Sequence, residues 1–112
     1  MTWDQVCALG LRLPEVLQSV SYGEPSLKFR KHLLTRLREA DNSIVLLDVP
    51  PEEREMLLSS APDIYFLEDH YRNYDIVLAR LTALTEKDVT PFLQRRWRNL
   101  APKRMVAAFD RE

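Results

Sequence analysis

Cysteine, glycine and histidine are scarce in this chain of 112 residues, and each shortage removes a class of site. The single cysteine, Cys7, excludes an internal disulfide and is typical of a reducing compartment, so we expect a cytoplasmic protein. With two glycines, the chain cannot form the common glycine-rich loops that hold phosphates. The two histidines lie far apart, and no cysteine–histidine cluster has zinc spacing, so we expect no metal and no other cofactor.

Long apolar runs are also missing, since no stretch approaches the roughly 20 residues that cross a bilayer. The first residues have no basic segment ahead of an apolar one, so we expect neither a membrane partner nor a secretory signal. Hydrophobic residues make up 46% and charged residues 29%, which argues against disorder. The length suits a single domain over residues 1–112, and no residue constellation favours catalysis, so we expect a non-enzymatic protein.

The periodicity of apolar residues predicts five strands and three main helices. The first helix opens with a capping box between Thr2 and Gln5. Pro91 favours a late start for the last helix, because proline inside a helix removes a hydrogen bond. We expect helices over 2–10, over 51–60 and from between 85 and 90 to about 101, a short turn or helix over 14–20, and strands over 26–30, 33–38, 43–49, 64–67 and 76–84.

This order of elements predicts an α+β fold with two layers. The expected architecture is a mostly antiparallel five-stranded sheet with helices packed on one face. An antiparallel sheet covered on one side leaves its other face in contact with water. Side chains on that face are therefore available to a partner.

The net charge of −1 hides a strong segregation of charge along the chain. The segment 27–38 holds five basic residues and no acidic one, and so does the segment 89–109. Between them, the segment 48–69 holds seven acidic residues and one arginine. The chain therefore has separate basic and acidic segments, which its net charge does not reveal.

Alternation along the predicted strands places the first basic group on one face. If Leu27, Phe29, Leu33, Thr35 and Leu37 point toward the helices, the cations between them point away. The predicted outer-face cations are Lys28, Arg30, Arg36, Arg38 and Arg80. Cations on adjacent strands repel one another, and a polyanion relieves that repulsion. The alternative is a solvated face on which these residues pair with Glu39, Asp41 or Asp48.

A second group of cations lies on the predicted last helix and just after it. Arg95 and Arg98 are three residues apart and point outward, whereas Trp97 falls on the apolar stripe and is predicted to be buried. Arg96 is expected on the flank, and Lys103 and Arg104 follow the helix. The loop 70–74, with its arginine Arg72, is the other unusual feature. Its tyrosines can stack on bases, or alternatively pack over the edge of the sheet.

Five motifs, taken in order, resemble the MmcQ/YjbR family of small bacterial proteins. They are Leu13-Pro14-Glu15-Val16, the run from Ser21 to Arg30, Pro51-Glu52-Glu53-Arg54-Glu55, His70-Tyr71-Arg72-Asn73-Tyr74 and the run from Trp97 to Arg104. The likeness covers roughly residues 1–105. It implies a compact fold like that of secretion chaperones and a DNA-binding role of the double-wing kind, with no catalytic residues to transfer. The sequence departs from the family at Lys31-His32, where a glycine is more usual.

Together, these observations favour a monomeric DNA-binding protein that contacts phosphates. The residues expected to bind nucleic acid are Lys28, Arg30, Arg36, Arg38, Arg72, Arg80, Arg95, Arg98, Lys103 and Arg104. The alternative is a protein–protein interaction module that uses the exposed sheet face or edge. An enzyme or small-molecule binder would need a pocket between the sheet and the loop 70–74.

Overall fold

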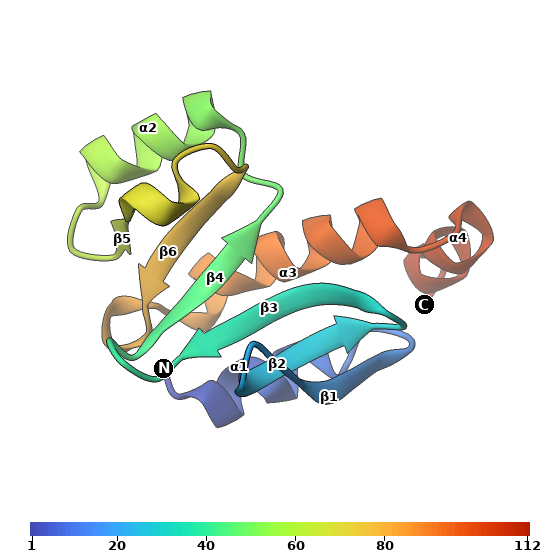
Figure 1. The fold of residues 1–112 in the computed structure, drawn as a ribbon. Helices are drawn as coiled ribbons and strands as arrows, with labels where there is room; N and C mark the ends of the chain where they lie inside the picture. The colour runs from blue at the N-terminus through green and yellow to red at the C-terminus, as the bar shows by residue number, and fades with distance from the viewer.

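The computed structural model describes residues 1–112, which form a six-stranded antiparallel sheet with helices packed against it (Figure 1). This confirms the α+β class, although the sheet has one strand more than predicted. The strands are β1 (Val16–Ser21), β2 (Glu24–Phe29), β3 (His32–Arg38), β4 (Ser43–Leu47), β5 (Tyr65–Phe66) and β6 (Ile76–Arg80). The helices are α1 (Trp3–Gly10), α2 (Pro51–Ser60), α3 (Glu86–Leu100) and α4 (Lys103–Asp110), with short 3₁₀ turns η1 (Asp69–Tyr71) and η2 (Leu81–Ala83).

The strands follow the order β1-β2-β3-β4-β6-β5, so β1 and the two-residue β5 form the edges of the sheet. In Figure 1, α3 runs behind the sheet and leads into α4, and α1 lies behind β1 and β2. The hydrophobic core lies between these helices and the inner face of the sheet, where Trp97, Phe29 and Leu27 are fully buried. The predicted burial of Trp97 is confirmed. The four helices include no candidate for a membrane-spanning segment.

The extra strand, β1, replaces the short turn or helix expected over 14–20. Val16 to Ser21 pair with Phe29 to Glu24, and Tyr22 and Gly23 form the two-residue turn between the strands. Both turn residues have positive φ angles, 53° and 75°, which match the right-handed twist of a hairpin. The helix prediction was wrong because tertiary pairing with β2 outweighs the helix-start signal of Pro14 and Glu15.

A register shift between β2 and β3 changes which residues of β3 face the core. The pairing slips between Leu27 and Lys28, so that Leu27 pairs with Thr35 and Lys28 with Leu33. Leu34 is buried in the core, at 1% exposure, whereas Leu33 lies on the outer face opposite Lys28. The inward assignment of Leu33 was therefore wrong, because an extra residue in one strand reverses the alternation beyond it.

The last long helix begins earlier than Pro91 suggested. Thr85 and Asp88 form a capping box, so α3 starts at Glu86 and carries Pro91 inside its second turn, on the exposed face. The reciprocal bonds at Thr85 stabilise this start and offset the bond that proline removes. The strand β6 also ends sooner than predicted, at Arg80, and a 3₁₀ turn follows.

Candidate functional site

Strand register brings several of the predicted cations onto the outer face of the sheet. Arg38 pairs with Ser43, and Ser43 pairs with Arg80, so the three side chains share one face. Arg36 lies on the same face, opposite Val45. Lys28 lies there too, but Arg30 does not, because it occupies the turn after β2 with a φ angle of 55°.

The outer-face arginines of β3 are held in ion pairs rather than left free. Arg36 donates to Glu24 Oε2 at 3.0 Å and to the hydroxyl of Tyr71 at 2.7 Å. Arg38 lies 2.8 Å from Glu68 and 3.2 Å from Asp41. The two arginine side chains are only 11% and 15% exposed. Arginines paired with carboxylates therefore describe this part of the face better than an array of repelling cations, and of the three carboxylates named in the alternative only Asp41 pairs with them.

Three other predicted cations near the sheet, Arg30, Arg72 and Arg80, also have partners. Arg30 lies 2.9 Å from Glu15, and its hydrogen bonds lower the pKa of the Glu15 carboxyl below the ordinary value. Arg72 lies 2.6 Å from Asp69 within the loop that precedes β6. Arg80 donates to the carbonyl of Pro62 at 3.1 Å and lies over the ring of Phe66.

The arginines of α3 connect this helix to the acidic segment and to α4. Arg95 donates two hydrogen bonds to the carboxylate of Glu53, and these bonds raise the pKa of the Arg95 guanidinium. Arg96 lies 3.2 Å from Asp48. Arg98 lies 2.6 Å from Asp110 of α4 and lowers the pKa of that carboxyl through its hydrogen bonds.

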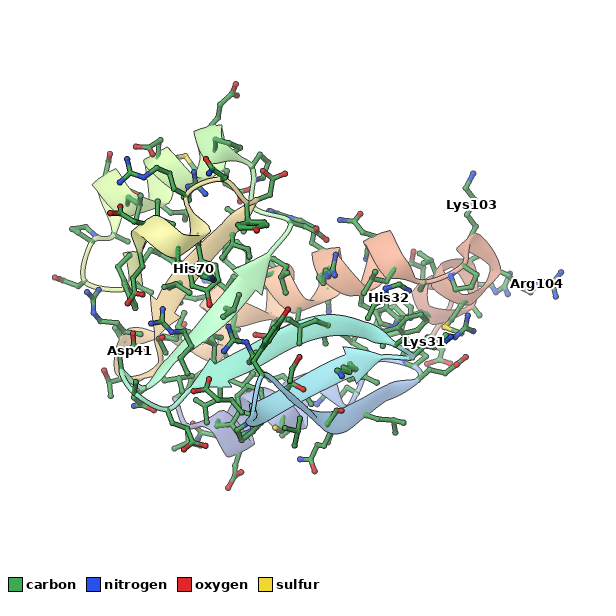
Figure 2. All side chains as sticks on the ribbon, in the orientation of Figure 1. Lys31, His32, Asp41, His70, Lys103 and Arg104 are labelled. Atoms are coloured by element: carbon green, nitrogen blue, oxygen red, sulfur yellow. The ribbon has the colours of Figure 1, made fainter.

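Four cations without a carboxylate partner lie at one end of the molecule. We call this set the basic end: Lys31, Lys103 and Arg104, which Figure 2 labels, and Lys28, which lies in β2 one residue before that strand ends. Figure 2 shows Lys31, in the β2–β3 turn, and His32, at the start of β3, at the same end of the molecule as Lys103 and Arg104 of α4. Aromatic contacts also bring the end of β2 close to α4. The ring centroid of Trp97 lies 6.4 Å from that of Phe29 in β2 and 5.0 Å from that of Phe109 in α4. Of the ten predicted residues, the fold thus leaves Lys28, Lys103 and Arg104 free in one place and adds Lys31.

A cleft of about 580 Å³ lies over the outer face of the sheet, between the sheet and the loop 70–74. Its floor is aliphatic and consists of Leu33, Val45, Leu47 and Ile76. Its walls are polar and aromatic and consist of Tyr22, Arg36, His70, Tyr71 and Tyr74. This volume falls within the range of about 300–1,000 Å³ that small-molecule sites occupy. The tyrosines of the loop therefore lie over the sheet face, not only over its edge.

A buried arginine that sequence reasoning missed holds the wall of this cleft. Arg54 of α2 is 4% exposed and donates to three backbone carbonyls, those of Tyr74 at 2.7 Å, Arg72 at 3.1 Å and Ile76 at 3.1 Å. A guanidinium presents several donors in a fixed fork, so one side chain orders the whole stretch. The sequence signal was present but weak: a single basic residue within the acidic segment 48–69.

Neither the models of known protein families nor the curated protein sequences contain a match to this chain. The likeness to the MmcQ/YjbR family stays a prediction from the motifs. The candidate sites are therefore the basic end and the outer-face cleft.

Proposed function

We propose that the protein binds DNA as a monomer, through phosphate contacts made by the basic end. The observation that carries this proposal is the gathering of Lys28, Lys31, Lys103 and Arg104 without carboxylate partners, from segments about seventy residues apart. The likeness to the MmcQ/YjbR family supports it. The ion-paired arginines of the sheet contribute less, because a phosphate must displace a carboxylate to reach them.

The physical basis of binding is release of the counterions condensed on the nucleic acid. Each phosphate that a lysine or arginine neutralises releases counterions, so the affinity falls as salt rises. The turn between β2 and β3 and the helix α4 lie at the same end of the molecule (Figure 1). Contacts of this kind position a protein on the backbone but do not read the bases. The proposal is thus binding with little sequence preference.

A titration of a fluorescent DNA duplex at two salt concentrations tests the proposal. We expect binding at about 50 mM salt that weakens steeply toward about 200 mM. The absence of binding at the lower concentration, or an affinity that ignores salt, would contradict it. Light scattering on the complex determines whether one protein chain binds at a time.

The edge strand β1 favours a second candidate function, recognition of a protein. Val16 to Ser21 carry no charge, and Leu17 and Val20 are 67% and 64% exposed. Uncovered edges without charge or proline invite the addition of another strand. Capture of a partner that survives nuclease treatment, and that Val20→Lys abolishes, would support this function over DNA binding.

A further inference from the structure

The cleft over the outer face contains aromatic rings that the fold leaves uncovered. Tyr22 is 88% exposed and Tyr74 is 59% exposed, although both line the cleft. Large rings bury most of their area when they serve the core. Rings that stay in solvent above an aliphatic floor are instead available to stack on a planar ligand.

Tyr22 also occupies a backbone position that tyrosine rarely takes. Its φ angle is 53°, in the left-handed region that favours glycine and asparagine. The ring gains little burial in return, and the guanidinium of Arg36 lies 5.3 Å from the ring centroid. The hairpin turn accounts for this φ angle, but neither the turn nor the core requires an aromatic ring here, so the ring is available to a ligand.

One polar group of the cleft wall, the hydroxyl of Tyr71, is suited to an uncharged acceptor. The hydroxyl of Tyr71 accepts a hydrogen bond from Arg36 at 2.7 Å, so its own hydrogen is left to donate. Glu24 offsets the charge of Arg36, and Glu68 with Asp41 offset that of Arg38. A planar ring with a carbonyl or ring-nitrogen acceptor therefore fits the cleft better than an anion does.

The cleft and the basic end are neighbours. Leu33 lines the cleft and pairs directly with Lys28, which belongs to the basic end. Paired strands lie about 4.8 Å apart, so a ligand that fills the cleft reaches the first free cation. A ring in the cleft and a phosphate at Lys28 thus fit one nucleotide unit.

We propose that the cleft binds an unpaired nucleobase, stacked on Tyr22 and Tyr74, while the attached backbone follows the basic end. This inference rests on the proposed function and deepens it, since it assigns single-stranded nucleic acid as the preferred form. Bases within a duplex are stacked on their neighbours and cannot enter the cleft. The arrangement resembles the stacking platforms on which single strands bind other proteins, with aromatic rings beside a positively charged path.

Two variants, each measured with a single strand of about 12 nucleotides and with the matching duplex, test this inference. Tyr74→Ala removes one ring and is expected to weaken single-strand binding roughly 5- to 150-fold, with duplex binding within about twofold of the parent. Tyr74→Phe keeps the ring and is expected to bind as the parent does. Met56→Ala is a matched control, because Met56 is equally exposed, at 59%, and lies on α2 outside the cleft. Thermal melting of each variant verifies folding.

The outcomes separate this inference from the proposed function. Equal losses for single strand and duplex, or no loss at all, overturn the cleft assignment while duplex binding through the basic end stands. If deoxyadenosine monophosphate competes as tightly as the oligonucleotide binds, the cleft takes free nucleotides and the strand assignment is wrong. If neither form of DNA binds at about 50 mM salt, both proposals fail.

Discussion

Replacing Lys31 and Lys103 together with glutamine removes half of the basic end without creating new charges. Lys31 lies in the turn after β2 and Lys103 begins α4. Both side chains are exposed and neither forms an ion pair, so the two substitutions remove no ion pair that stabilises the fold. With four contacts, the logarithm of the duplex affinity should fall with the logarithm of salt with a slope of about −3.6. With two contacts left, the slope should be about −1.8.

These slopes translate into affinities that a fluorescence titration resolves. The parent should lose roughly 150-fold in affinity between about 50 and 200 mM salt. With electrostatic contributions taken to vanish at about 1 M salt, the double variant should bind roughly 200-fold more weakly than the parent at about 50 mM, and only about 20-fold more weakly at about 200 mM. The narrowing of the difference is diagnostic, because a variant that had merely lost structure would be weaker by a similar factor at both concentrations.

Lys87→Gln is the matched control, since Lys87 is also exposed and unpaired but lies at the start of α3. The 15 residues of α3 put it about 20 Å from the basic end. Its slope should equal that of the parent. The reasoning is refuted if Lys87→Gln costs as much as the double variant, or if the double variant keeps the parent slope.

Three further predictions concern the core and the cleft wall. Arg54→Leu removes the donors that hold the carbonyls of residues 72–76, so we expect a loss of about 2–4 kcal/mol in denaturant unfolding and faster amide exchange in that stretch. Burial raises the pKa of the Cys7 thiol, so iodoacetamide at about pH 8 should label native protein much more slowly than unfolded protein. Because the unfolded thiol ionises above about pH 8.5 while the native thiol stays protonated, Cys7 should make stability decline as pH rises beyond that value, an effect that Cys7→Ala should abolish. Gly10→Ala would place a Cβ 2.5 Å from Leu27 Cδ1, and thermal melting should show a net loss of about 1 kcal/mol, as overpacking outweighs the gain in helix propensity.

Local signals in the sequence were sufficient where structure depends on near neighbours. The capping box of Thr2 and Gln5 predicted the start of α1, and the apolar stripe of the last helix predicted the burial of Trp97. Alternation also placed Arg36 and Arg38 on the outer face. Each of these features depends on residues within a few positions of one another, which is the range of capping and periodicity arguments.

Features that depend on distant residues were not predictable in this way. The strand β1 exists because β2 pairs with it, and the slip after Leu27 reverses the side of Leu33 without a proline or glycine to mark it. The partners of Arg36 and Arg38 lie 12 and 30 residues away, at Glu24 and Glu68. The cleft likewise needs the loop 70–74 to fold back over the sheet, which no local pattern specifies.

The segregated charges of the sequence largely cancel when the chain folds. The acidic segment 48–69 supplies partners to both basic segments, as in the pairs Arg38–Glu68 and Arg95–Glu53. Four cations without carboxylate partners lie together at one end, in β2, in the turn after it and at the start of α4. A count of charges along the chain therefore overstates the number of cations available to bind DNA. The available cations are those of the basic end, which have no carboxylate partners.

If the cations without carboxylate partners determine DNA binding, then removing the partner of one more cation should strengthen that binding. Arg98 lies on the last turn of α3, beside the basic end, and its carboxylate partner is Asp110. Asp110→Asn should make the slope steeper by about 0.9 and tighten duplex binding at about 50 mM salt by up to roughly 15-fold. Asp63→Asn changes the net charge equally, but Asp63 is unpaired and precedes β5 at the far end of the sheet, so its slope should match the parent. An equal effect of both variants would mean that net charge, rather than the place of the free cation, governs binding.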